Sequence, residues 1–359
     1  MKALLPFLSL LISLHLYSCG TSSYDDWEIN YEIRNDSCNA EDSCINDSCK
    51  NDPGSDNTDT GSLIFTIRKY ATANYSCQSM ACYGDYAFIV SDKMHYIGLF
   101  NLKKKTSIYT ATLPSRTEKT PGGNAKFHCN QSSFSPYKYD RNDEFPVLYI
   151  SQRYDNSYRC EIVGLRIIPE YGADGEIKSF KTNLVQTLFL PAMNRENALG
   201  NANLVFDLEH QRMITYSRNN NSSDPNYNKC RISTFDIPQL NQDTIYLDDC
   251  DIRDSYEIAC SAMNMQGGAV YGDRLYIGQG YESCGYINIR VVDLVKRKLQ
   301  ITYDLLKMGV TWEPEGCIAY DDKLIIHASN TLWEFPNIFD ISEKITDTSL
   351  IKVNYTLGE

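Results

Sequence analysis

The chain has 359 residues, and its 42% hydrophobic content is enough to build a sizeable core. Its 26 Tyr residues fall largely in Val/Ile-rich runs, which favours strands over helices. The formal net charge is −12, and the short basic triplets 103–105 and 296–298 stand where hairpins are expected to turn. Because an acidic chain gains nothing from releasing counterions of a phosphate backbone, this composition argues against a nucleic-acid partner.

Residues 1–18 have the pattern of a lipoprotein signal peptide. Lys2 supplies a positive charge, and the apolar run 3–16 has the length of a signal h-region but is too short to span a bilayer. The run ends in Leu-Tyr-Ser-Cys-Gly at 16–20, which resembles a lipobox, although Tyr17 is an unusual occupant of its position. That resemblance implies cleavage before Cys19 and acylation of its thiol and new amine by fatty acids such as palmitate. An ordinary signal peptide with an incidental Cys is the alternative.

A flexible acidic tether is predicted for residues 19–61. The stretch from Gly20 to Gly61 holds 11 Asp or Glu residues against two basic ones and has few large apolar side chains. Such a segment cannot bury enough apolar surface to offset the entropy of ordering it. A calcium loop at 52–59 lacks the EF-hand spacing, and a zinc site of Cys38, Cys44 and Cys49 lacks a suitably spaced fourth ligand.

Disulfides are expected because 12 of the 13 Cys residues remain after Cys19 is set aside, and an exported chain meets an oxidising compartment. Cys77 and Cys82 are close enough in sequence to pair locally. Cys129 with Cys160 and Cys250 with Cys260 are further pairings that the sequence leaves open.

A repeated unit organises residues 62–359. Each copy has a polar start, a short strand, a turn marked by Asp or Gly, a second apolar strand and a third strand. Their starts lie at 78, 128, 201, 266 and 313, and Tyr-Gly-Asp or Tyr-Asp-Asp marks the first turn of copies one, four and five. The intervals between these starts, 47 to 73 residues, suit four-stranded sheets with loops of different length and no helical repeat.

These repeats predict an all-β chain folded as a five-bladed β-propeller, preceded by the signal peptide and the disordered tether. Radial closure would leave no long exposed edge. Either the strand 63–67 or the strand 350–355 is expected to complete the last blade. A pair of β-sandwiches with coincidental repetition is the alternative fold.

The chain resembles an uncharacterised family of bacterial five-bladed propeller lipoproteins. The residues that carry the resemblance are His-Cys-Asn at 128–130, Phe-Pro-Val-Leu-Tyr-Ile-Ser at 145–151, Leu-Val-Gln-Thr at 184–187, Gln-Gly-Gly at 266–268 and Glu-Pro-Glu-Gly at 313–316. The resemblance covers nearly the whole body. It implies a propeller on a lipid anchor in the cell envelope and no established activity, since fold alone does not license one.

A candidate ligand site is expected where the first strands of the blades begin, because those strands line the central channel. Its residues would be Gln78, His128, Asn130, Gln131, Asn203, Gln266, Trp312, Glu313 and Glu315. Amides and carboxylates that converge near an aromatic ring suit a polar ligand. The alternative is that these groups bond to one another, or to water, and only cap the channel.

The preferred functional hypothesis is a binding or scaffold module for a glycan or an exported protein, with no cofactor and no catalytic residue assigned. It would be lipid-anchored to the outer membrane, on the periplasmic face or the cell surface. The alternative resembles lactonase-type propellers and is a calcium-dependent hydrolase with Asn130, Asn203 and Glu315 on the metal. A glycosidase is disfavoured, because both carboxylates of the site lie in one copy rather than on different blades.

Overall fold

A computed structural model describes much of the chain after residue 61. The described residues are 62–66, 77–91, 96–112, 129–152, 160–190, 203–218, 223, 225, 229–261, 265–281, 286–308, 310, 312–328 and 331–335. For 62–66, 77, 96, 106–112, 152, 259–261, 281 and 331–335 the description covers the backbone alone. The predicted signal peptide, Cys19, the tether, His128 and the strand 350–355 lie outside the described residues.

The described strands form five sheets, named here sheets 1 to 5 in chain order. Sheet 1 has the order β2 (Cys77–Tyr83), β3 (Tyr86–Ser91), β4 (Tyr96–Asn101), β5 (Thr106–Thr112). Sheet 2 has the order β6 (Cys129–Phe134), β7 (Leu148–Gln152), β8 (Glu161–Tyr171), β9 (Ile177–Phe189), β13 (Thr244–Tyr246). Sheet 3 has the order β10 (Asn203–Asp207), β11 (Arg212–Arg218), β12 (Lys229–Asp236), β14 (Ile252–Ser261).

Sheet 4 has the order β15 (Met265–Tyr271), β16 (Arg274–Tyr281), β17 (Tyr286–Asp293), β18 (Lys298–Asp304). Sheet 5 has the order β19 (Gly316–Tyr320), β20 (Lys323–Ala328), β21 (Thr331–Phe335), β1 (Ser62–Thr66). Neighbouring strands are antiparallel except for β13, which runs parallel to β9. The strands expected within each repeat therefore all form, and each repeat builds one sheet.

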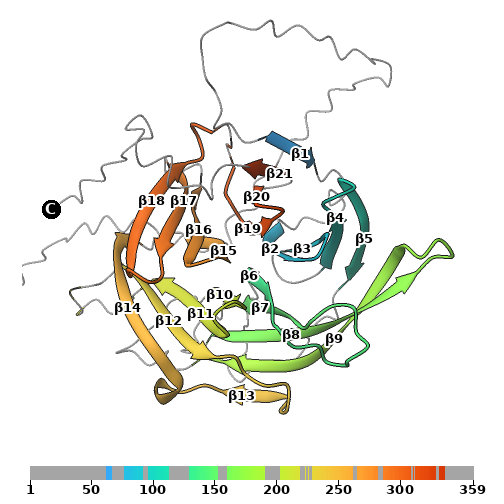
Figure 1. Cartoon of the computed structure of the whole chain (residues 1–359), viewed down its shortest axis with the longest axis horizontal. Coiled ribbons are helices and arrows are strands. Elements are labelled where there is room, and N and C mark those ends of the chain that lie inside the picture. Colours follow the sequence, from blue (N-terminus) through green and yellow to red (C-terminus); the bar gives the residue numbers. More distant parts are fainter. Residues whose placement is uncertain are drawn as a thin grey trace, which may run out of the picture. The chain divides into compact units, whose positions relative to one another are not determined.

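The five sheets are arranged around a common centre. Their first strands contact one another in a closed cycle, β2 with β6, β6 with β10, β10 with β15, β15 with β19 and β19 with β2. Figure 1 shows these inner strands around the middle of the ring, with the later strands of each sheet outside them. This arrangement is a β-propeller, so the predicted all-β propeller fold is confirmed and the β-sandwich alternative is wrong.

The ring closes by joining the start of the body to its end. Strand β1 pairs with β21 through Ser62–Glu334 to Thr66–Thr331, and so adds the outer strand of sheet 5. Of the two closing strands that the sequence left open, the N-terminal one therefore completes this sheet. The inner strands meet closely as well, because a Cβ on Gly316 would lie 2.7 Å from the backbone nitrogen of Met80.

The core lies between adjacent sheets, whose inner strands are covered on both faces. Every residue of β10 is buried, and so are the last five residues of β3. This explains why these strands read as continuous apolar runs rather than as an alternating pattern. An aromatic cluster fills the space between sheets 1 and 2, where the Phe88 ring lies edge-on to Phe134, Phe145 and Phe180 at 5.1–6.0 Å.

The hairpin turns form as the sequence predicts. Gly84 and Gly272 have φ angles of 56° and 54°, and Asp321 and Asp322 have φ angles of 50° and 56°. These left-handed conformations are accessible to Gly and tolerated by Asp, which fits the Tyr-Gly-Asp and Tyr-Asp-Asp motifs. Lys103, Lys104 and Lys105 are exposed in the turn after β4, which agrees with the predicted role of that basic triplet.

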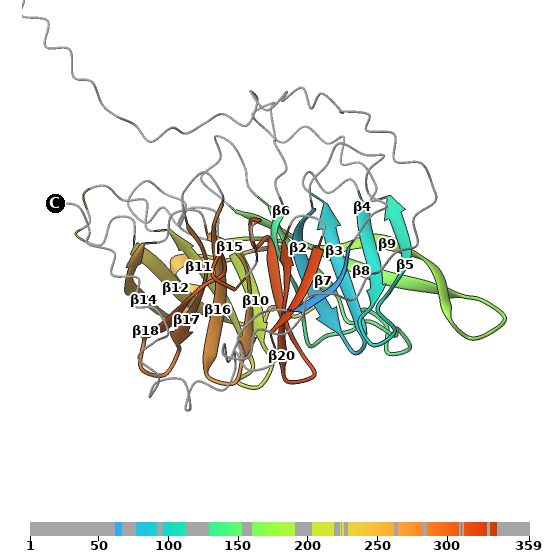
Figure 2. The same cartoon turned by 90° about the horizontal axis from the view of Figure 1, so that it is seen from above.

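The connection between β12 and β14 of sheet 3 crosses to sheet 2. Residues 237–251, which follow β12 and end in the 3-10 turn η3 (Asp249–Asp251), place β13 beside β9. The buried side chain of Gln186 binds this segment, because its Nε2 donates to the backbone carbonyls of Gln239 and Gln242 at 2.8 and 2.9 Å. In the same sheet, the long hairpin of β8 and β9 extends outward past the neighbouring strands (Figure 2).

The disulfide pairings suggested by the sequence are wrong. Cys82 and Cys250 are free thiols, which excludes their pairing with Cys77 and Cys260. The Cys129 thiol lies 3.0 Å from the Ser79 hydroxyl, and the Cys160 thiol donates to the carbonyl of Glu161, so these two are not joined either. No disulfide occurs within the described residues. No helix in that part of the chain has the length and apolar character needed to cross a membrane.

Candidate functional site

Buried polar side chains gather at one end of the ring. We call this end the mouth: it is where the inner strands begin and where the antiparallel second strands finish. Register pairs such as Met265–Gln279 and Gly316–His327 bring the two sets of strand ends to the same level. Ser91, Ser151, Ser217, Gln279 and His327, which lie at the ends of the second strands, are at most 1% exposed.

Four of the predicted site residues form a hydrogen-bonded chain that crosses four inner strands at the mouth. Asn130 Nδ2 on β6 donates to Asn203 Oδ1 on β10 at 2.7 Å. Asn203 Nδ2 donates to the backbone carbonyl of Gln266 on β15 at 3.2 Å, and Gln266 Nε2 donates to Glu313 Oε1 beside β19. Residues from different repeats therefore share one rim, as the propeller prediction requires.

The remaining pair closes the other side of this rim. Gln78 Nε2 on β2 donates to Glu315 Oε1 at 3.0 Å, and both side chains are buried. The backbone N–H of Glu315 also donates to the carbonyl of Glu313 at 3.0 Å, which links the pair to the first chain. We refer to these six residues, Gln78, Asn130, Asn203, Gln266, Glu313 and Glu315, as the mouth belt.

A second layer below the mouth belt fixes its backbone. The Gln131 amide bonds to both backbone groups of Gly268, donating to its carbonyl at 2.7 Å and accepting from its N–H at 2.8 Å. Tyr216 donates its hydroxyl proton to the Gln266 carbonyl at 3.0 Å. Full burial raises the pKa of Tyr216 well above its usual value, so this hydroxyl stays protonated and remains a donor.

The glycines of the fourth repeat permit this close packing. A Cβ on Gly267 would lie 2.7 Å from the Glu315 carbonyl, and one on Gly268 would lie 2.6 Å from the Tyr216 hydroxyl. A side chain at either position would push β15 away from β19 or from Tyr216. The Gln-Gly-Gly sequence thus positions the Gln266 amide at the mouth.

Most of the hydrogen-bonding capacity of the mouth belt is used internally, as the capping alternative expects. Gln266 is an exception. Its Oε1 has no hydrogen-bond partner among the described residues although Gln266 is only 7% exposed, and a buried acceptor left in this way is costly. Next to Glu313, the side chain of Trp312 is 52% exposed. The mouth therefore offers the Gln266 Oε1 acceptor, the neighbouring Glu313 carboxylate and, next to Glu313 in the chain, the half-exposed Trp312.

The candidate calcium ligands do not form a set suited to that ion. Asn130 turns its amide nitrogen toward Asn203, so the Asn203 oxygen already accepts a hydrogen bond, and Glu315 accepts from Gln78. Calcium requires six to eight oxygen ligands that converge on one point. Within the described residues no group of three His, Cys, Asp or Glu side chains is arranged around a metal position.

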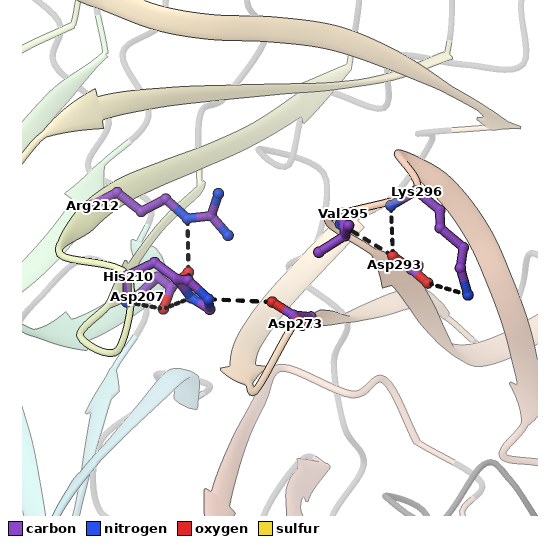
Figure 3. A network of polar contacts seen from close by, with 7 residues as sticks. All are labelled: Asp207, His210, Arg212, Asp273, Asp293, Val295 and Lys296. Carbon is purple, nitrogen blue, oxygen red and sulfur yellow. Dashed lines mark hydrogen bonds and ion pairs between the residues drawn. The ribbon is translucent and has the colours of Figure 1, made fainter.

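A second polar network lies in the turns that follow β10 and β15, at the end of the ring opposite the mouth. Figure 3 shows its side chains between sheets 3 and 4. His210 Nδ1 is 2.9 Å from Asp207 Oδ2, and its Nε2 is 3.2 Å from Asp273 Oδ1. Arg212 Nε donates to the same buried Asp207 at 2.7 Å. The sequence signal for this contact is Asp207 itself, which stands three residues before His210 at the end of β10. This network joins two sheets, and no Ser, Thr or Cys side chain among the described residues hydrogen bonds to it.

Comparisons with known proteins add the following. No family model matches the chain, and no curated protein is found to be a relative. Among solved structures, a glucose dehydrogenase is 10% identical with a TM-score of 0.42, covering 77% of this chain and 98% of its own. Glutaminyl cyclase of Myxococcus xanthus is 7% identical with a TM-score of 0.40, covering 77% and 92%. The Myceliophteria thermophila Cps50 (Swd1) β-propeller domain is 10% identical with a TM-score of 0.34, covering 71% and 82%. At this identity, none of these similarities carries an activity over to the chain.

Proposed function

We propose that the protein is a binding module whose mouth holds a polar, hydroxyl-bearing ligand, with a glycan as the ligand class. The observation that carries this proposal is the mouth belt, which brings amides and carboxylates from all five repeats to one rim. Carboxylate and amide oxygens accept hydrogen bonds from sugar hydroxyls, and amide nitrogens donate to them. Small-ligand sites combine a few convergent groups of this kind with aromatic surface.

Two details favour a binding role over a purely structural cap. Gln266 keeps an acceptor without a partner, whereas a finished cap would satisfy it. Trp312, which directly precedes Glu313 of the mouth belt in the chain, is 52% exposed, and a sugar ring can stack on an exposed indole. Catalysis receives no comparable support, because the two carboxylates of the mouth belt come from one repeat.

A glycan-binding assay tests the proposal. We expect the purified chain to bind at least one neutral or amino oligosaccharide by calorimetry, and Trp312→Ala to weaken that binding by about tenfold. Tyr246→Ala is the matched control, because Tyr246 is an aromatic residue 58% exposed on β13, the outermost strand of sheet 2 and four strands away from β6. Equal losses in both variants, or no binding across a broad glycan panel, would overturn the proposal.

We also propose that the module is held in the bacterial cell envelope by acylation of Cys19, as in the lipoprotein family that the sequence resembles. Lipid chains of this kind anchor a protein without spanning the bilayer. Metabolic labelling with an alkyne fatty acid should mark the full-length chain, and Cys19→Ser should lose both the label and the membrane fraction. Retention of the label in that variant would refute the anchor.

A further inference from the structure

We infer that the group recognised at the mouth is a protonated amine, so that the ligand is an amino sugar with a free ammonium group. This inference rests on the proposed function and narrows its ligand class. It follows from the hydrogen-bonding state of Gln266, from the charge beside it and from the aromatic surface next in the chain.

Gln266 is held on three sides. Its backbone carbonyl accepts from both Asn203 and the Tyr216 hydroxyl, and its side-chain nitrogen donates to Glu313. The side chain is therefore fixed, and its remaining polar atom, Oε1, is an acceptor without a partner. Because the residue is more than nine-tenths buried, that acceptor is pre-organised for a ligand atom that carries a proton.

The neighbouring charge favours a cation as the proton donor. Glu313 contributes a carboxylate in direct contact with Gln266, and Glu315 contributes a second one two residues away. An ammonium group carries three donors and a positive charge, whereas a hydroxyl carries a single donor and none. Hydrogen bonds between ionised partners are about twice as strong as neutral ones.

The aromatic residue beside this pair suits the same ligand. Trp312 precedes Glu313 and is half exposed, and indole is the best aromatic surface for a cation. A sugar that carries a carboxylate would meet Glu313 and Glu315 as like charges, and the net charge of −12 would oppose its approach. The mouth should thus select amino sugars over N-acetylated, neutral and acidic sugars.

Three tetrasaccharides with the same linkage test the inference: β-1,4-glucosamine, β-1,4-N-acetylglucosamine and β-1,4-glucose. At a mildly acidic pH we expect the glucosamine oligomer to bind at least about tenfold more tightly than the other two, and added salt to reduce that preference. Glu313→Gln keeps an oxygen for Gln266 but removes the charge, so it should bring the three affinities within about threefold of one another. Glu170→Gln, which neutralises an exposed carboxylate on β8, is the control and should leave the preference intact.

The outcomes separate the two proposals. Equal binding of the three oligomers, or a preference that survives in Glu313→Gln, would overturn the amine inference and leave the glycan site standing. If 1,4-diaminobutane binds with the affinity of the glucosamine oligomer, the inference of an ammonium group stands and the proposal of a glycan ligand is overturned. No binding of any probe would overturn both proposals. Urea unfolding of each variant shows that it is folded before its affinity is compared.

Discussion

The side chains of Gln78 and Glu315 form a 3.0 Å hydrogen bond although 237 residues separate them. Gln78 belongs to the first inner strand and Glu315 immediately precedes the last. The bond therefore closes the ring of inner strands at the mouth, while β1 closes sheet 5 at its outer edge. The ring is thus closed both at its inner strands and at its outer edge. The Gln78–Glu315 hydrogen bond of the candidate site therefore also has a structural role.

This bond should contribute measurably to stability. Gln78→Ala deprives a buried carboxylate of a donor, and we expect the free energy of unfolding to fall by about 1–3 kcal/mol. Urea denaturation measures this change. Tyr320→Phe is the control: it removes the 3.0 Å bond from Tyr320 to Asp85, which also joins sheets 5 and 1 but is less buried, and should cost about 1 kcal/mol or less. A loss in Gln78→Ala no larger than the control would contradict the closure role.

Gly268 should not accept a side chain. In Gly268→Ala the new Cβ would lie 2.6 Å from both the Tyr216 hydroxyl and the Tyr276 carbonyl, so β15 would have to move. Overpacking of this kind costs about 1–3 kcal/mol, which thermal melting should detect. Gly272→Asn is the matched control, because no atom lies near its Cβ and Asn tolerates its φ of 54°. Similar melting temperatures for Gly268→Ala and the wild type would show that β15 has room for a side chain beside Tyr216.

The network of Figure 3 should depend on Asp207 far more than on Asp273. The side chain of Asp207 is 1% exposed and contacts both His210 and Arg212, whereas that of Asp273 is 57% exposed. We expect Asp207→Asn to reduce the free energy of unfolding by about 2–4 kcal/mol, because it leaves the Arg212 guanidinium and the His210 ring without the buried carboxylate that they contact. Asp273→Asn should change it by less than about 1 kcal/mol. Chemical denaturation of the two variants compares them directly, and equal effects would contradict this assignment.

Stability should decline in alkaline solution. Burial raises the pKa of the Cys317 thiol to about 12, from a usual value of 9.0, and burial likewise raises the pKa of Tyr276 to about 12. The unfolded chain ionises these groups at lower pH than the folded chain, so above about pH 9 it binds fewer protons and unfolding becomes easier. Urea midpoints measured from neutral pH upward should fall through this range.

Alkylation provides a second readout of the same burial. Because the thiolate is the nucleophile, Cys317 should resist iodoacetamide in the folded protein at mildly alkaline pH and react after unfolding. The exposed Cys250 should react in both states and serves as the internal control. Rapid labelling of folded Cys317 would contradict its burial.

The sequence by itself determined the local structure of this protein. The Val/Ile/Tyr-rich apolar runs, the Tyr-Gly-Asp turns and the recurring polar starts were enough to predict the strands, the repeats and the propeller, because strand propensity and turn conformation depend on neighbouring residues. The same repetition correctly predicted that Gln78, Asn130, Asn203, Gln266 and Glu315 share one rim.

Only the tertiary structure decided which groups contact each other. No sequence period encodes the contact of Gln78 with Glu315, the crossing of β13 to the neighbouring sheet or the contact of His210 with Asp273. The sequence likewise did not show that Cys82 and Cys250 are free thiols. Hydrogen bonds and disulfides require atoms within a few ångströms of each other. Those distances are set by how closed sheets pack against one another, and that packing depends on the whole ring rather than on any single repeat.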